Sequence, residues 1–300
     1  MSDRGAVAIT GANGYVGMTL CAAFDAAGYR VIALQRSAPG DARDYLSYSL
    51  EGGPTASLPG DVAAVVHCAY DLRARDRAEI ERINIGGTEK LLRAIGDVPM
   101  VLISSQSAYV GTRQIYGRVK LACEDLVAAR GGTSLRLGLV HGGSDGGMIG
   151  ALRKVAGLPV VPMPRPDSQQ YAVHAQDMAR CVVATAEQRP PHRMLGVANP
   201  RPVSFSEIMR TLRAAKTAQP LRSVPVPSAL LYRALRAAEG IGVRAGFRAD
   251  SLLGLMHPAP DVPHVEHWAE CGITLRDLAD DAMAGTVTPA FPLNLRRAAR

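Results

Sequence analysis

The first hundred residues alternate short apolar runs with stretches of helical periodicity. Ala6 to Ile9 is an apolar run bounded by glycines, and Met18 to Ala27 has apolar positions at helical spacing before Gly28. The pattern then predicts strands at 30–34, 63–67 and 100–103 and a helix at 79–95. Such alternation is typical of an α/β fold of the Rossmann type, a doubly wound parallel sheet with helices on both faces.

The second half of the chain is less regular. The predicted elements are a helix at 116–129, a strand at 134–140 and a helix at 177–188. Prolines become frequent beyond residue 150, and from Val203 onward several amphipathic helices alternate with proline-containing turns. We therefore predict a dinucleotide-binding domain at 1–150, to which residues 170–200 return, and a smaller, mainly helical substrate lobe at 151–300.

A glycine-rich loop joins the first strand to the first helix. Its glycines have Gly-x-x-Gly-x-x-Gly spacing, and the N–H groups of the loop and the dipole of the following helix would face a pyrophosphate. The residues expected to bind the cofactor here are Gly11, Asn13, Gly14, Tyr15, Val16 and Gly17. A purely structural turn is the alternative interpretation.

The end of the second strand indicates which dinucleotide is bound. An acidic residue usually accepts hydrogen bonds from the adenosine ribose of NAD at this position. This chain has Gln35 and Arg36 there, and an arginine can pair with a 2′-phosphate. We expect NADP(H) as the cofactor, with NAD(H) as the alternative.

Composition and charge narrow the class of protein. The 300 residues are 47% hydrophobic and 20% charged, which indicates a globular chain, and the net charge is +7. The arginines are scattered rather than gathered in one stripe, so we expect no nucleic-acid partner. The five cysteines are widely spaced without a Cys-x-x-Cys pair, which argues against disulfides and a metal site. No segment has the length of an apolar membrane span, and we expect a cytoplasmic protein without a membrane partner.

Several separate segments resemble the extended short-chain dehydrogenase/reductase family, which includes nucleotide-sugar epimerases, dehydratases and reductases. Tyr116 and Lys120 match its Tyr-x-x-x-Lys signature, and 104–109 is similar to its Ser-Ser-x-x-Val-Tyr stretch. The other similar segments are the glycine loop, 65–69, 84–88, 135–138 and 173–177. The resemblance covers roughly residues 1–210. The segment before Tyr116 is shorter than is usual in the family, and Val110 separates Tyr109 from Gly111.

The resemblance implies a catalytic role for three residues. Tyr116 and Lys120 are four positions apart, so they share a helix face. Tyr116 would exchange a proton with the substrate oxygen, Ser105 would hydrogen-bond the same oxygen, and Lys120 would lower the pKa of the phenol from about 10 to about 7. Whether Ser105 or a neighbouring serine faces the cleft depends on the register of the strand. Cys68 and Ala69 would lie beside the cofactor.

The resemblance implies hydride transfer at a carbonyl or alcohol carbon of a nucleotide-linked sugar, by an oxidoreductase or an epimerase. Arginines beyond residue 150 are candidates to bind its diphosphate: Arg153, Arg165, Arg201, Arg210 and Arg213. A reductase of a non-sugar carbonyl compound is one alternative, which an apolar cleft would favour. A non-catalytic protein that senses NADP or serves as a structural subunit is the other. The family also implies a homodimer formed through the helix that carries Tyr116.

Overall fold

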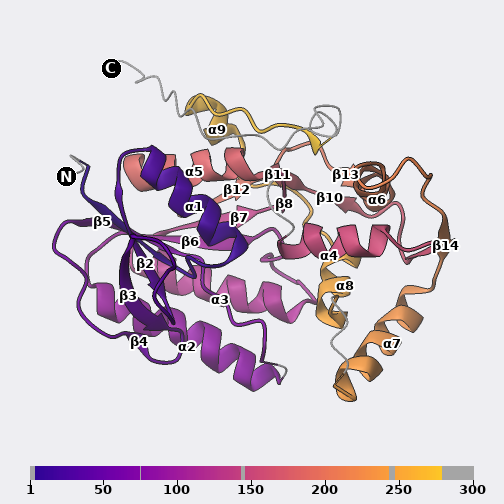
Figure 1. The fold of residues 1–300 in the computed structure, drawn as a ribbon, viewed down its shortest axis with the longest axis horizontal. Helices are drawn as coiled ribbons and strands as arrows, with labels where there is room; N and C mark the ends of the chain where they lie inside the picture. The colour runs from indigo at the N-terminus through magenta and orange to yellow at the C-terminus, as the bar shows by residue number, and fades with distance from the viewer. Residues whose placement is uncertain (1–3, 75, 143–145, 243–246, 279–300) are drawn as a thin grey trace.

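The main sheet of the protein has eight strands, as a computed structural model describes for residues 4–74, 76–142, 146–242 and 247–278. The strand order is β12-β7-β6-β5-β1-β2-β3-β4 (Figure 1). In chain order these strands are β1 (Ala6–Thr10), β2 (Arg30–Gln35), β3 (Asp44–Ser49), β4 (Gly53–Pro54), β5 (Val62–His67), β6 (Met100–Ser105), β7 (Thr133–Leu137) and β12 (Met194–Val197). This order around β1 is that of a Rossmann sheet, so the predicted fold class is confirmed.

The first seven strands of this order run parallel, as the sequence predicts, and only β4 pairs antiparallel, with β3. The sequence pattern missed β3 because this strand at the sheet margin contains mostly Ser and Tyr in place of aliphatic residues, and Tyr48 is its one buried residue. The parallel arrangement brings the carboxyl ends of β1, β2, β5 and β6 to one edge, where a ligand binds in folds of this kind.

Helices cover both faces of the sheet. The helices are α1 (Tyr15–Ala26), α2 (Arg77–Ile95), α3 (Ile115–Ala129), α4 (Gly147–Ala156), α5 (Ala175–Gln188), α6 (Phe205–Ala214), α7 (Ser228–Gly240), α8 (Ala249–Met256) and α9 (Glu266–Glu270). One apolar core contains side chains of α1 and α5, and a second contains side chains of α2 and α3 (Figure 1). The sheet is therefore covered by a layer of helices on each side.

The chain leaves the main sheet at Gly138. The predicted strand at 134–140 is two strands, because the chain changes its partner at Gly138, whose N–H donates to Val197 while that of Leu139 donates to Tyr171. Only glycine fits at this change, since a Cβ at Gly138 would lie 2.6 Å from the Tyr171 oxygen. Smaller sheets follow, formed by β8 (Leu139–His141) with β11 (Ala172–His174), β9 (Val161–Met163) with β14 (Ser223–Pro225), and β10 (Gln169–Gln170) with β13 (Val203–Ser204). The chain then returns to the main sheet as β12.

A third apolar core lies beyond the sheet. It is built from side chains of α4, α6, α8 and β9, including Leu152, Val161, Ile208 and Leu255. We call residues 147–163 and 203–256 the distal region. No helix in the described part of the chain is long and apolar enough to cross a bilayer.

Candidate active site

Tyr116 and Ser105 meet at the edge of the sheet. Ser105 is the last residue of β6, and Tyr116 lies in the first turn of α3, which follows after a short loop. The Ser105 hydroxyl lies close enough to the Tyr116 phenol to lower its pKa. Ser104 points away from them and donates to the buried carboxylate of Glu124. The strand register therefore places Ser105, rather than Ser104, next to the tyrosine.

Burial controls the acidity of Tyr116. Burial raises the pKa of the phenol to about 12. The nearby Cys123 raises this pKa further, and the hydroxyl of Ser105 lowers it. The prediction of a pKa near 7 is therefore wrong for the protein alone, since Lys120 does not offset the cost of desolvating a phenolate. Tyr116 is a protonated phenol at neutral pH, a form suited to giving a proton away.

Lys120 lies one turn further along α3 and is buried. Its Nζ donates to the backbone oxygen of Ile103 at 2.7 Å and lies 5.9 Å from the ring centroid of Tyr116. Burial lowers the pKa of this amine. The structure thus brings Tyr116, Lys120 and Ser105 together, with the ammonium group held by the backbone of β6.

Tyr70 is a member of the site that the sequence analysis missed. It follows β5 by three residues, and its ring meets the ring of Tyr116 edge-on, with centroids 4.7 Å apart. The Nζ of Lys120 lies 5.2 Å from the Tyr70 centroid. Tyr70 therefore forms a wall against both α3 side chains. Its position directly after the matched segment at 65–69 was the signal in the sequence.

The glycine loop has the geometry that a dinucleotide needs. Gly11 has a φ of +64°, and a Cβ at Gly17 would lie 2.1 Å from the oxygen of Gly11, so the loop can fold back only with glycine there. No side chain caps the N-terminus of α1, whose first turn contains Tyr15 and Val16. Asn13 is exposed beside this helix end. Uncapped N–H groups next to a tight glycine turn fit a pyrophosphate.

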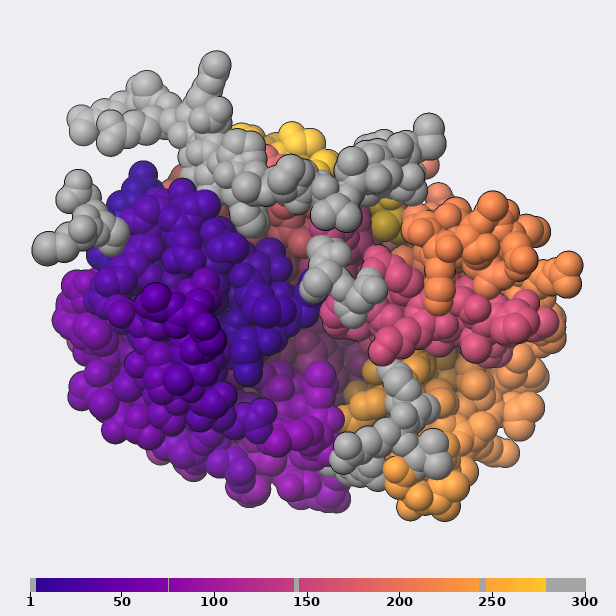
Figure 2. All heavy atoms as spheres, viewed as in Figure 1, coloured from indigo at the N-terminus to yellow at the C-terminus, as the bar shows by residue number. Residues whose placement is uncertain are grey.

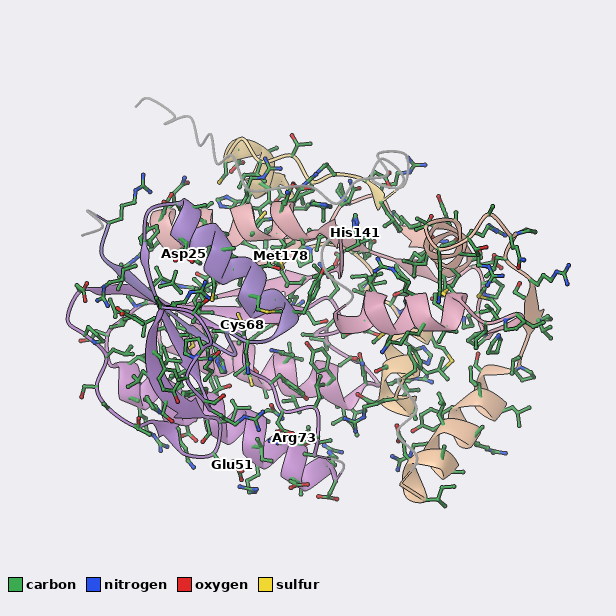
Figure 3. All side chains as sticks on the ribbon, viewed as in Figure 1. Asp25, Glu51, Cys68, Arg73, His141 and Met178 are labelled. Carbon is green, nitrogen blue, oxygen red and sulfur yellow. The ribbon has the colours of Figure 1, made fainter. Side chains whose placement is uncertain are left out.

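Thr10 and His67 hold the neighbouring wall of the cofactor site. The Thr10 hydroxyl accepts from the N–H groups of Cys68 and Ala69, both at 3.1 Å, and contacts the Nδ1 of His67 at 2.7 Å. A Cβ at Gly11 would lie 3.0 Å from Ala69. Figure 3 labels Cys68 at this position. Burial raises the pKa of the Cys68 thiol, which is therefore neutral.

His67 is a structural residue. Because the Thr10 oxygen already accepts two N–H groups, its own hydrogen goes to Nδ1 of His67, and Nε2 donates to Thr88 at 3.1 Å. Burial lowers the pKa of His67 to about 3. The ring is thus a neutral link between β1, β5 and α2, and a role as general base does not fit.

Arg36 lies at the end of β2, where the sequence analysis expected a contact to the adenosine ribose. The Gln35 side chain turns inward and donates to the oxygen of Ser37 at 2.9 Å, while Arg36 is exposed. Among the described residues Arg36 has no ion-pair partner. Its guanidinium group is available to an anionic ligand.

Asp250 of the distal region caps the helix that carries Tyr116. Gln114 precedes α3 without capping it, and the Asp250 carboxylate accepts from the N–H groups of Ile115 at 2.8 Å and Tyr116 at 3.2 Å. Burial raises the pKa of Tyr70, and the Asp250 carboxylate adds to this rise, because a like charge nearby opposes ionisation. No sequence pattern indicated Asp250, since its partners lie more than 130 positions earlier.

A pocket opens beside Ser105. Its lining comes from β6, from the chain around Gly138 and from the end of α8, and includes Gln106, Leu137, Tyr171 and His257. No lysine or arginine is among the described residues that line it. The described lining of the pocket is therefore apolar and neutral polar, and Ser105 belongs both to this lining and to the pair with Tyr116.

Three of the five candidate diphosphate arginines are engaged elsewhere. Arg165 donates to the oxygen of Met256 at 2.6 Å, and Arg213 donates to the oxygen of Ala156 at 2.9 Å. Arg201 pairs with Asp277 at 3.2 Å. These contacts tie segments of the chain together and leave the guanidinium groups committed to protein oxygens.

The segment at 173–177 also proves structural. Asp177 is fully buried and accepts from the backbone and side chain of Arg276, and His174 Nδ1 accepts from the N–H of Gln176 at 3.2 Å. Within the described ranges, no group of His, Cys, Asp and Glu side chains is arranged to hold a metal, and the five cysteines are all free thiols.

Comparison with known proteins identifies the family. Residues 7–197 match the model of the NAD dependent epimerase/dehydratase family. The chain belongs to this family. The ceramide reductase of Caulobacter vibrioides is 30% identical over 250 residues, which cover 77% of each chain. Family membership confirms the prediction of an NAD(P)-dependent enzyme of the extended short-chain dehydrogenase/reductase type.

Solved structures of other family members share the fold. MoeE5 in complex with UDP-glucose and NAD superposes with a TM-score of 0.67 at 20% identity, covering 94% of this chain and 97% of MoeE5. The UDP-N-acetylglucosamine 4-epimerase from Bacillus cereus has a TM-score of 0.60 at 20% identity and covers 83% and 96%. At this identity the likeness shows the fold alone.

Proposed function

We propose that this chain is an NAD(P)-dependent reductase of a ketone carried on a lipid. The observation that carries the proposal is the pair of Tyr116 and Ser105, a protonated phenol beside a serine that also lines a pocket with no lysine or arginine among its described lining residues. The similarity to a ceramide reductase over 77% of both chains supports a lipid substrate.

The site residues would divide the chemistry as follows. When bound, the nicotinamide would supply a hydride to the carbonyl carbon. A C–H bond forms there as the C=O π bond breaks, and the π electrons leave a negative charge on oxygen. Tyr116 gives its proton to that oxygen, so the product is an alcohol. The Ser105 hydroxyl donates a hydrogen bond to the same oxygen and positions it. Lys120 stabilises the phenolate that remains until a proton from solvent restores it.

The glycine loop and Arg36 would hold the cofactor. Gly11, Asn13, Gly14, Tyr15, Val16 and Gly17 surround the pyrophosphate, and Cys68 and Ala69 line the opposite wall. The exposed Arg36 and the absence of a carboxylate at the end of β2 support NADP(H) over NAD(H). A cytoplasmic location, a division into two domains near residue 150 and a homodimer formed through α3 remain predictions.

A nucleotide-linked sugar is the second candidate substrate. The structural similarity to MoeE5, which is bound to UDP-glucose, favours it. Against it, Arg165, Arg201 and Arg213 are engaged with protein oxygens. A reductase of a lipid ketone requires no diphosphate contact, so we rank it first.

The proposal is tested by the loss of nicotinamide absorbance with two matched substrates. One is a long-chain keto-ceramide in mixed micelles, and the other is a nucleotide 4-keto-sugar. Turnover of the first, with a kcat/KM at least about a hundredfold higher, is the expected result. Preference for the sugar would overturn the substrate class while leaving the reductase chemistry, and turnover of neither substrate would overturn both.

A further inference from the structure

Exposed aliphatic side chains gather at the end of the distal region, where β14 and α7 lie at the right of Figure 1. We call Leu158, Val160, Val224 and Leu230 the rim; they are 45%, 49%, 49% and 62% exposed. Leu158 and Val160 precede β9, which pairs with the strand that carries Val224. The Ser228 hydroxyl donates to the oxygen of Pro164 at 3.2 Å, which anchors the start of α7 next to the end of β9. The rim is therefore one surface built from two chain segments.

The outer face of helix α7 is not covered by the described part of the molecule. None of its residues from Ser228 to Gly240 is buried, although it contains three leucines. Leu231 and Leu235 are half-buried on the side of α8, and Leu230 faces solvent. Ile241, directly after the helix, is 81% exposed. A surface helix normally buries its apolar stripe, so an outer apolar face of this kind indicates a further contact.

The same surface is strongly basic. Residues 208–238 contain no Asp or Glu, and their cations are Arg210, Arg213, Lys216, Arg222, Arg233 and Arg236. Arg213 is buried against backbone oxygens, and the other five are exposed, of which Arg236 pairs with Glu239 at 3.5 Å. The Lys216 ammonium lies against Gly157, since a Cβ there would be 2.5 Å from Nζ. A cation therefore lies beside Leu158, within the rim. Figure 2 shows this end of the molecule, with α6, β14 and α7 in orange.

We propose that the rim and α7 dock on the surface of an anionic lipid bilayer. Aliphatic side chains enter the region between head groups and acyl chains, and arginine and lysine beside them pair with the phosphates. A second copy of this chain is a poorer fit, because two such surfaces would bring like charges together. No membrane partner was expected from the sequence. Contact of the protein with the bilayer surface replaces that expectation, and such contact requires no spanning helix.

The docking surface connects to the active site. The chain runs from Val160 in the rim to Gln170, which lines the pocket beside Ser105. Arg165 and Gln170 both donate to oxygens at the end of α8, so this connection is fixed. Residues 160–170 thus link the docking surface to the pocket along the chain. Delivery of a lipid ketone from the bilayer to the pocket rests on the proposed function, whereas binding of the protein to a bilayer does not.

The test is cosedimentation of the whole chain with sucrose-loaded vesicles, measured without substrate. The vesicles contain phosphatidylcholine alone or with about 30% phosphatidylglycerol. Leu230→Glu is the test variant. Leu72→Glu is its matched control, because Leu72 is a leucine of similar exposure, 64% against 62%, that does not belong to the rim or to α7. Arg222→Glu tests the charge.

We expect the wild type to pellet with the anionic vesicles. Salt at 0.5 M should lower its partition coefficient about tenfold. Leu230→Glu and Arg222→Glu each lower the coefficient about tenfold, and Leu72→Glu changes it less than twofold. Equal losses for Leu230→Glu and Leu72→Glu, or no wild-type binding, would overturn the proposal. So would a shift from dimer to monomer caused by Leu230→Glu in light scattering. Reduction of a short-chain ketone in the absence of vesicles tests the reductase separately.

Discussion

The carboxylate of Asp250 lies 3.2 Å from the backbone nitrogen of Tyr116 and so joins the distal region to the helix that presents the phenol. Removing this cap in Asp250→Ala frees the first turn of α3 and shifts Tyr116 relative to Ser105. We expect kcat to fall about ten- to hundredfold, with the cofactor KM within twofold. Stability falls by only about 1 kcal/mol.

The pattern of effects distinguishes positioning from folding. Asp250→Asn retains one acceptor and should recover part of kcat, and Asp97→Ala, at an exposed aspartate, should match the wild type. Steady-state kinetics at saturating cofactor and thermal unfolding supply the measurements. A loss of stability without a loss of kcat per folded molecule would remove Asp250 from the positioning of Tyr116.

Glycine substitutions test the cofactor loop. A methyl group at Gly17 meets the oxygen of Gly11 at 2.1 Å, whereas a methyl group at Gly86 in α2 meets nothing within 4 Å. Gly17→Ala should therefore weaken cofactor binding at least about tenfold, and Gly86→Ala should leave it unchanged and raise stability by up to about 1 kcal/mol. Titration of nicotinamide fluorescence measures both variants. Equal affinity in the two would mean that the loop does not approach the cofactor.

The exposed Arg36 should set the preference for the phosphorylated dinucleotide. Arg36→Ala removes a charged contact to a 2′-phosphate, so we expect the Kd of NADPH to rise about tenfold or more and the Kd of NADH to change less than twofold. Arg130→Ala, at an exposed arginine directly after α3, is the control. If the two cofactors weaken equally in Arg36→Ala, Arg36 does not recognise the phosphate.

The buried Asp177 links stability to pH. Burial alone would raise its pKa, but the hydrogen bonds from Arg276 and Arg180 outweigh burial and lower the pKa below the ordinary 3.8. A depressed folded-state pKa contributes stability above the unfolded pKa and loses it as the pH falls through the folded value. Asp177→Asn should thus lower the free energy of unfolding by about 2 kcal/mol at pH 7, a figure already reduced because Arg276 is 33% exposed. Below pH 3.8 the loss should become progressively smaller.

Denaturant unfolding at several pH values measures this dependence. Glu51→Gln, in the exposed pair with Arg82, is the control and should change stability by less than about 0.5 kcal/mol. A difference between wild type and Asp177→Asn that does not shrink in acid would show that the charge of Asp177 is not its source.

Local pattern determined much of what the sequence could predict. Apolar runs marked β1 and β5, the first of them bounded by glycine, and the i, i+4 spacing of Tyr116 and Lys120 placed both on α3. The predictions that failed concern properties that depend on tertiary contacts. The acidity of Tyr116 follows from burial against Tyr70, the cap from Asp250 comes from a distant helix, and Arg165, Arg201 and Arg213 hold protein oxygens.

The role of Tyr116 as proton donor is tested most directly by stopped-flow hydride transfer in Tyr116→Phe, with the cofactor and the ketone that proves to be the substrate. The variant keeps the ring that packs on Tyr70, so we expect the cofactor Kd within twofold of the wild type. The hydride-transfer rate should fall at least about a thousandfold, while Tyr45→Phe in β3 retains the wild-type rate. An unchanged rate in Tyr116→Phe would contradict the account and assign proton transfer to another group.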